Sequence, residues 1–314
     1  MAKYRILSLD GGGVRGVYTA VLLKRLEARA PGFLASIDLF AGTSTGGIIA
    51  LALAFGLTPD DLIELYHDNA EAIFADSIAD DMRDLGKLLG ADYDQGPLRK
   101  LLEERFGDKV LGDLVKRVLI SAFDLDPGED QPERVWQPRF FHNYPPAPGK
   151  PDDRTARIVD VALATSAAPT FFPSYRGYVD GGVAANNPSM CALAQALDKH
   201  TGKQKLEDIR LLSLSTGVDP RVVTGDTLDW GYVQWAPVLV HMMIEGPMQT
   251  AHYQCKRLLG ETGYRRVAPL LPRAIGLDGA KHVADLIEYA NDVDLDAPAP
   301  LGVAEWVKAE LAPE

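Results

Sequence analysis

The chain has few cysteines and no excess of basic charge. Among its 314 residues only Cys191 and Cys255 carry thiols, and their spacing fits neither a disulfide framework nor a metal site. Lys and Arg number 32 against 44 Asp and Glu, which leaves a net charge of −12. Because a nucleic-acid partner requires a concentrated basic surface, we expect no such partner.

Long apolar runs are also lacking. No stretch approaches the roughly 20 apolar residues that a membrane-spanning helix needs. The opening letters, MAKYRILSLDGGG, enter a strand pattern almost at once, which leaves no room for a signal peptide. We therefore expect a cytoplasmic protein that contacts a membrane, if at all, peripherally from one side.

What the chain does contain is an alternation of strand and helix patterns. Strand patterns occupy residues 4–10, 36–44, 117–125, 177–180 and 209–217, with one more inside the loop 126–150. Helical patterns occupy 17–31, 46–56, 58–74, 157–169 and 190–200, continue from 75 to 106, and dominate after Trp230. Runs such as 119–123 and 209–214 are apolar throughout, which is typical of parallel strands covered on both faces. We predict one α/β domain over residues 1–314, with a mostly parallel sheet between two helical layers.

The first strand ends in a glycine-rich corner, DGGGVRG, at residues 10–16. Glycines allow tight turns and close approach to a ligand, and N–H groups at a helix start suit an anion. Gly11, Gly13 and Gly16 also fit the dinucleotide fingerprint G-x-G-x-x-G. That fingerprint expects an acidic residue at the end of the next strand. Here Asp38 opens that strand instead, so we do not favour dinucleotide binding.

The second corner is GTSTG at residues 42–46, between a strand and a helix. This is the pattern of a nucleophile elbow, in which small neighbours permit a strained turn that exposes the serine hydroxyl. The alternative is that Thr43, Ser44 or Thr45 only caps a buried helix.

The third corner, VDGGVAANNP at residues 179–188, sets Asp180 at a strand end before two glycines. Alone it is an ordinary Asp-Gly turn. All three corners follow predicted strands, however, and the carboxyl ends of parallel strands meet at one crevice. Together they offer what acyl transfer needs: an oxyanion hole, a nucleophile and a base.

The segments DGGGVRG, GTSTGG, ATSAAPTFFP and DGGVAANNP, in this order, resemble the patatin-like phospholipases over residues 4–220. The resemblance implies a patatin-like fold, hydrolysis of lipid acyl esters through a Ser–Asp dyad, an acyl-lipid partner such as a phospholipid, and neither cofactor nor metal. It assigns Ser44 as nucleophile and Asp180 as proton acceptor. The oxyanion hole would comprise Gly11, Gly12 and Gly13, with Arg15 supporting that loop and its positive potential. The remaining motif glycines are Gly16, Gly42, Gly46, Gly181 and Gly182.

Other functions remain alternatives. A Ser–Asp–His triad of the α/β-hydrolase kind would place its elbow later in the chain, and none of the six histidines has a triad-like setting. A small-ester serine esterase, or a non-catalytic sensor or scaffold that binds a phosphate ligand, would also use glycine loops. A carboxylate facing a phosphate would repel it, which argues against the sensor.

The part after residue 220 has no assigned role in this interpretation. The text DWGYVQWAPVLVHMMIEG at 229–246 suits either a lid or acyl channel, or a core-facing helix. We favour the core-facing helix. Likewise, we interpret the basic text KRLLGETGYRR at 256–266 as a solvated helix face rather than a headgroup patch.

Overall fold

The computed structural model describes residues 3–74, 91–129, 133–146, 149, 151–225, 227–297 and 302–313. Within them, seven strands form one sheet in the order β4-β3-β2-β1-β6-β7, and β5 also pairs with β3. The strands are β1 (Tyr4–Leu9), β2 (Leu39–Thr43), β3 (Arg117–Asp124), β4 (Gln137–His142), β5 (Tyr178–Asp180), β6 (Ile209–Leu214) and β7 (Tyr264–Val267). The pairs β1–β2, β1–β6, β2–β3 and β6–β7 are parallel, whereas β4 and β5 run antiparallel to β3. The predicted α/β fold with a mostly parallel sheet is confirmed.

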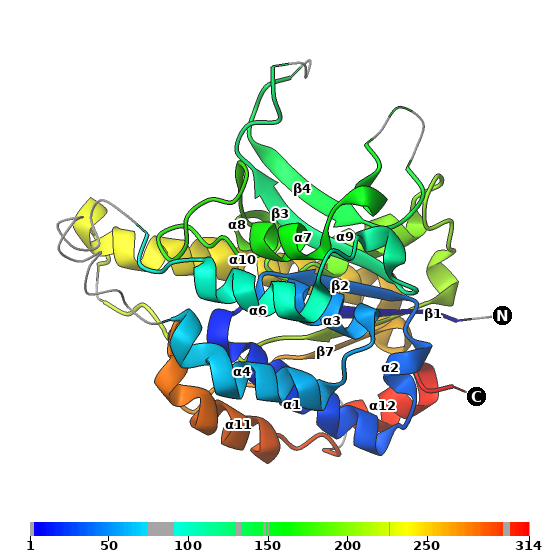
Figure 1. The fold of residues 1–314 in the computed structure, drawn as a ribbon. Coiled ribbons are helices and arrows are strands. Elements are labelled where there is room, and N and C mark those ends of the chain that lie inside the picture. Colours follow the sequence, from blue (N-terminus) through cyan, green and yellow to red (C-terminus); the bar gives the residue numbers. More distant parts are fainter. Residues whose placement is uncertain are drawn as a thin grey trace.

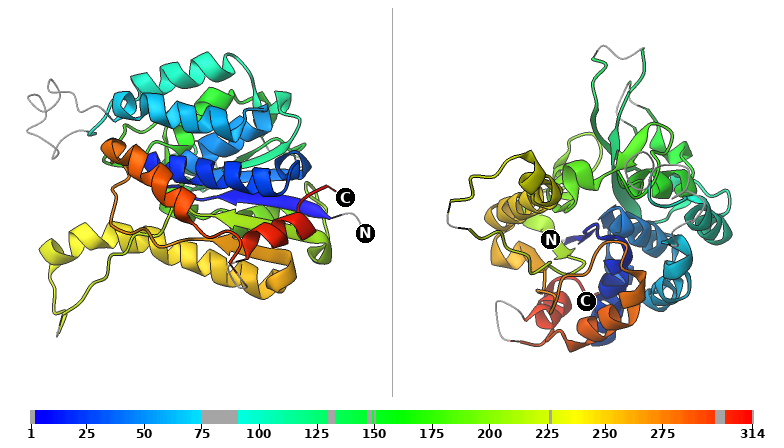
Figure 2. Two further views of the ribbon diagram at one scale, coloured as in Figure 1. Left: turned by 90° about the horizontal axis from the view of Figure 1, so that it is seen from below. Right: turned by 90° about the vertical axis from the view of Figure 1, so that its left-hand side faces the viewer.

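Helices cover both faces of this sheet (Figure 1; Figure 2, left). They are α1 (Gly16–Arg29), α2 (Phe33–Ser36), α3 (Thr45–Phe55), α4 (Pro59–Ile73), α6 (Gly96–Phe106), α7 (Ile158–Thr165), α8 (Gly182–Ala185), α9 (Ser189–Leu197), α10 (Tyr232–Gly263), α11 (Val283–Asp292) and α12 (Val303–Glu310). The element boundaries follow local sequence signals. At α4, for example, Thr58 Oγ1 accepts the Asp61 N–H at 3.2 Å and Asp61 Oδ2 accepts the Thr58 N–H at 2.7 Å, which is the capping box.

Among the described residues, two hydrophobic cores lie on opposite faces of the sheet. Leu7 and Leu9 of β1 belong to the larger core, with α1, α3, α4, α7 and α11. Ile6, the neighbour of Leu7 in β1, belongs to the smaller core with α9 and α10. Successive side chains of a strand point to opposite faces, so an apolar run buries both. This is why the central strands lack polar alternation.

The C-terminal part differs from the prediction. It is not only helical, because residues 264–267 form β7, the parallel neighbour of β6. The four letters YRRV are too short and too basic to indicate a strand, and pairing with β6 decides their conformation. The predicted turn after Asp180 begins with the one-turn helix α8. The helical text at 75–90 lies outside the described residues.

Candidate active site

Ser44 lies in the turn between β2 and α3, with φ 54° and ψ −126°. Few residues other than glycine adopt this conformation, so the turn is strained. A β-carbon at Gly42 would lie 2.1 Å from the Gly46 carbonyl oxygen, and one at Gly46 would lie 2.3 Å from the Leu9 carbonyl oxygen. Only glycine fits at either place. The predicted strand–turn–helix with serine at its corner is present.

Thr165, at the end of α7, holds this turn. Its Oγ1 accepts the Ser44 backbone N–H at 2.8 Å and donates to the Ser121 carbonyl at 2.6 Å. The Ser44 N–H is thereby tied to β3. Sequence reasoning included Thr165 in a motif but gave it no role.

Asp180 reaches Ser44 through the topology of β5. Thr43 of β2 pairs with Ser121 of β3, and Asp180 of β5 pairs with the next residue, Ala122. Because β4 occupies the other edge of β3 at these residues, β5 lies on the β2 edge. Along this edge of β3 the strands β2 and β5 therefore run toward each other and meet end to end.

The Ser44 hydroxyl and the Asp180 carboxyl lie next to each other at this meeting point, and the hydroxyl lowers the pKa of the carboxyl in part. Both residues are buried, with 8% and 6% of their surfaces exposed. The Gly182 N–H donates to Asp180 Oδ1 at 2.7 Å, and the Asp180 N–H donates to the Ala167 carbonyl at 2.9 Å. The carboxylate is thus fixed in position beside the serine hydroxyl.

Burial raises the pKa of Asp180 to about 6, although the Ser44 hydroxyl and the hydrogen bond from the Gly182 N–H lower it in part. Removal from water disfavours the charged form. A carboxylate with this pKa is a better proton acceptor than an exposed aspartate and is still mostly ionised at pH 7.

The glycine loop lies against Ser44. A β-carbon at Gly11 would be 3.2 Å from the Ser44 β-carbon. The Gly11 N–H donates to the Asn186 carbonyl at 3.0 Å, so it is not available to a reacting group. The N–H groups of Gly12 and Gly13 have no acceptor within the described part of the chain. Of the three glycines predicted as oxyanion donors, Gly12 and Gly13 therefore stay candidates, whereas the Gly11 N–H is already engaged.

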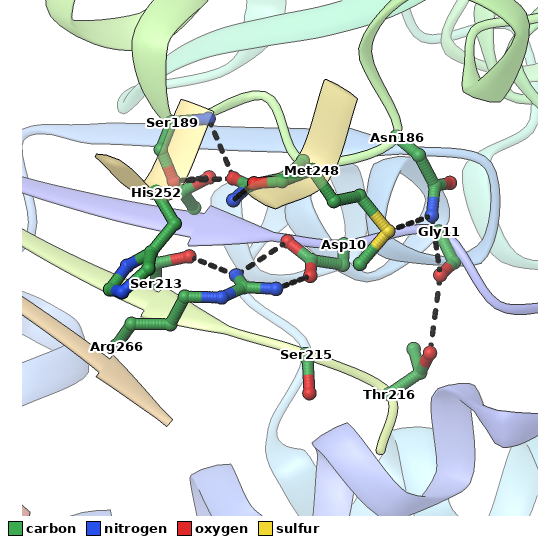
Figure 3. A network of polar contacts seen from close by, with 12 residues as sticks. Asp10, Gly11, Asn186, Ser189, Ser213, Ser215, Thr216, Met248, His252 and Arg266 are labelled. Atoms are coloured by element: carbon green, nitrogen blue, oxygen red, sulfur yellow. Dashed lines mark hydrogen bonds and ion pairs between the residues drawn. The ribbon is translucent and has the colours of Figure 1, made fainter. Parts of the chain in front are cut away.

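Figure 3 shows the network behind this loop. Arg266 of β7 pairs with Asp10, the residue before Gly11, through Nη2–Oδ2 at 2.6 Å and Nη1–Oδ1 at 3.2 Å. Its Nη1 also donates to Ser213 Oγ at 2.7 Å. Thr216 Oγ1 donates to the Gly11 carbonyl at 3.1 Å. The interpretation of 256–266 as a solvated helix face is therefore wrong for Arg266, whose side chain is buried.

Arg15 closes the turn that follows the loop. Its backbone N–H donates to the Gly12 carbonyl at 3.1 Å, and its side chain is buried. Burial lowers the pKa of the guanidinium, while the charges of Asp219 and Glu245 favour its ionised form. The role of Arg15 in supporting the loop and its positive potential stays a prediction. Gly16 begins α1 beside Thr45 and Tyr66.

The groups of the alternative mechanisms lie elsewhere. The six histidines are all described, and the hydrogen bonds of His67, His241, His252 and His282 go to Asp68, Arg221, Tyr264, and to Arg273 and Asp285. None of these bonds reaches Ser44 or Asp180. Asp38 accepts the Arg5 N–H at 2.7 Å, where β1 and β2 begin, at the end of the sheet opposite the glycine loop.

Proteins similar to this chain identify its family. The family model described as patatin-like phospholipase matches residues 7–193, which include all three corners. This family consists of serine hydrolases that act on lipid acyl esters. The chain belongs to the patatin-like phospholipase family.

Individual relatives are bacterial and plant proteins. The chain is 33% identical over 268 residues to a cGAMP-activated phospholipase of Pseudomonas aeruginosa, covering 83% of this chain and 77% of that protein. It is 30% identical over 281 residues to patatin-like protein 2 of Oryza sativa subsp. indica, covering 73% and 65%. Among solved structures, VipD from Legionella pneumophila aligns with a TM-score of 0.40 at 12% identity, over 92% of this chain and 67% of that one.

Proposed function

We propose that this protein hydrolyses the carboxylic ester bonds of phospholipids or lysophospholipids through a Ser44–Asp180 dyad. The observation that carries the proposal is that strand pairing sets the buried Ser44 and Asp180 side chains next to each other, at a strained turn beside the glycine loop. The family supplies the class of reaction, and the geometry supports these two residues for its chemistry.

The reaction starts when Ser44 Oγ attacks the ester carbonyl carbon while its proton passes to the Asp180 carboxylate. The carbonyl oxygen becomes an oxyanion, and the Gly12 and Gly13 N–H groups stabilise its charge. The C–O bond then breaks, and Asp180 returns the proton to the leaving alcohol. Water then attacks the acyl-serine while Asp180 takes its proton, the bond between the acyl carbon and Ser44 Oγ breaks, and Asp180 returns the proton to Oγ as the fatty acid leaves.

A fluorophosphonate probe and a panel of esters test this proposal. We expect the wild-type protein to react covalently at Ser44 and to hydrolyse long-chain esters faster than acetate esters. Ser44→Ala should lose both labelling and turnover while its fold stays intact. Substantial turnover by a well-folded Ser44→Ala variant would move the nucleophile elsewhere.

The panel also separates the other candidates. A preference for acetate esters would favour a small-ester esterase, and absence of labelling would favour a sensor that binds phosphate. Because one relative is named for activation by cGAMP, each assay is run with and without cGAMP. If the probe labels Ser44 only when cGAMP is present, this protein is also activated by cGAMP.

A further inference from the structure

We propose that the first half of α10 and the loop before it form a docking surface for a phospholipid bilayer. We call this surface the α10 lobe and define it by its apolar side chains: Val222, Trp230, Val233, Trp235, Leu239, Met242 and Met243. The choice of bilayer as occupant rests on the proposed function, since the proposed substrate is a lipid.

The lobe carries an apolar stripe in which Leu239, Met242 and Met243 are exposed and Trp235 is half-buried. Trp235, Leu239, Met242 and Met243 stand at i, i+4, i+7 and i+8 and thus share one face of the helix. Half of Met242 and 68% of Met243 are exposed. Trp235 contacts Trp230 of the loop, with ring centroids 5.2 Å apart. The predicted core-facing helix at 229–246 is therefore wrong for this face.

The second half of the same helix behaves differently. Met248, Ala251 and Cys255, at i, i+3 and i+7, are buried against the body. They anchor α10, whereas the first half projects beyond the rest of the fold (Figure 1; Figure 2, left). No helix in the described ranges is both long and apolar enough to cross a membrane. Any lipid contact of the lobe is therefore interfacial.

The second half of α10, which follows the lobe along the chain, begins beside the candidate active site. Met248 Sδ lies 3.0 Å from Asn186 Nδ2, and the Met248 carbonyl accepts from Asn187 Nδ2 at 3.3 Å. The Asn186 carbonyl in turn accepts the Gly11 N–H. The preceding loop starts from Thr216, which also contacts Gly11. A bilayer bound to the lobe would therefore bring its lipid esters close to the glycine loop.

Side-chain chemistry and charge select the occupant. Trp suits the interface between headgroups and acyl chains, and Met adapts to irregular apolar surroundings. Along residues 219–245 the sequence carries four acidic residues, Asp219, Asp226, Asp229 and Glu245, against one arginine, Arg221, which pairs with Asp219 at 3.0 Å. Two copies of a chain of net charge −12 would repel each other across this acidic segment. A zwitterionic bilayer has no net charge, so apolar insertion meets no opposing field.

Vesicle flotation in a Ser44→Ala background, which prevents lipid hydrolysis, measures docking directly. We expect this protein to float with phosphatidylcholine vesicles and Met242→Glu/Met243→Glu to lower its partition coefficient about tenfold or more. Val222→Glu in the loop is a second, independent variant. The matched control is Val115→Glu: Val115 is 91% exposed and lies just before β3, away from the lobe. Adding anionic lipid should not strengthen binding.

Two further readouts make the outcome decisive. In the active protein, the double variant should lose about tenfold or more of its rate on phosphatidylcholine vesicles and keep its rate on a soluble ester. Flotation equal to that of the parent protein in both lobe variants would overturn the proposal. So would a wild-type dimer that the double variant dissociates while flotation is unchanged. If the protein hydrolyses no ester at all, the proposed function fails, but flotation still decides the docking surface.

Discussion

Asp180 lies beside Ser44 because the two residues stand at the facing ends of β5 and β2, which pair with adjacent residues of β3. The antiparallel direction of β5 is essential to this arrangement. A parallel β5 on the same edge would end away from Ser44. Strand pairing thus brings the two residues of the proposed dyad together, with no histidine placed between them.

Replacement of Asp180 by Asn should lower kcat by orders of magnitude, because the amide cannot accept the serine proton. For the wild-type protein, kcat/KM on a soluble ester should rise with pH through about 6, since burial raises the pKa of Asp180 to that value. Stopped assays from about pH 4 to 9 measure the profile. Single replacement of each histidine is the control. A histidine variant as inactive as Ser44→Ala would require a triad.

The same substitution should stabilise the protein at alkaline pH. The folded state holds the Asp180 proton more tightly than the unfolded chain does, because its pKa is raised from 3.8 to about 6. The free energy of unfolding of the wild type should therefore fall as pH rises from about 4 to 6, by at most about 3 kcal/mol. Asp180→Asn removes this loss. Urea unfolding of the wild type and Asp180→Asn at about pH 4 and pH 8 tests this prediction. If the difference between their free energies of unfolding does not grow with pH, the pKa of Asp180 is not raised in the folded state.

Strain at Ser44 predicts a difference between two inactive variants. Ser44→Ala keeps a β-carbon at φ 54°, whereas Ser44→Gly relieves the turn. The strain costs on the order of 1–3 kcal/mol, and glycine loses about 0.5–1 kcal/mol through backbone entropy. We expect Ser44→Gly to melt above Ser44→Ala in calorimetry. Equal or reversed melting temperatures would mean that the turn is relaxed.

Gly12→Ala should impair catalysis through the loop backbone. Its β-carbon would lie 2.1 Å from Thr216 Oγ1 and 2.6 Å from Thr216 Cβ, so the loop must move away. Loss of one oxyanion donor costs about 10²–10³ in kcat. Gly246→Ala is the matched control, because a β-carbon there meets nothing within 4 Å. If a folded Gly12→Ala variant keeps the kcat of Gly246→Ala, the oxyanion hole lies elsewhere.

Arg266→Met should be among the most destabilising substitutions in the C-terminal part. It leaves the Asp10 carboxylate buried without its partner, at a cost of about 3–5 kcal/mol. Asp10→Asn/Arg266→Met should recover much of this stability in urea unfolding. Its kcat should nevertheless stay below that of the wild type, because Asp10 precedes the glycine loop. Full activity of the double variant would show that the pair only stabilises the fold.

Much of this protein could be predicted locally. The alternation of strands and helices, the capped start of α4, and the three corners depend on residues close in sequence. Periodicity, capping and glycine conformation act over a few residues, so their signals can be read directly from the letters. Ser44 at its strained turn is such a case, since Gly42 and Gly46 are two residues away on either side.

Tertiary structure decided the rest, through contacts between residues far apart in the chain. The short YRRV segment becomes a strand only because β6 offers its edge, and Arg266 becomes buried only because Asp10 meets it there. The Gly11 N–H cannot bind a substrate because it donates to the Asn186 carbonyl. Most of the apolar side chains of the α10 lobe are exposed because the first half of α10 extends past the surface that buries its second half. A hydrophobic sequence indicates that burial is favourable, but only the packed fold determines whether another apolar surface lies close enough to bury it.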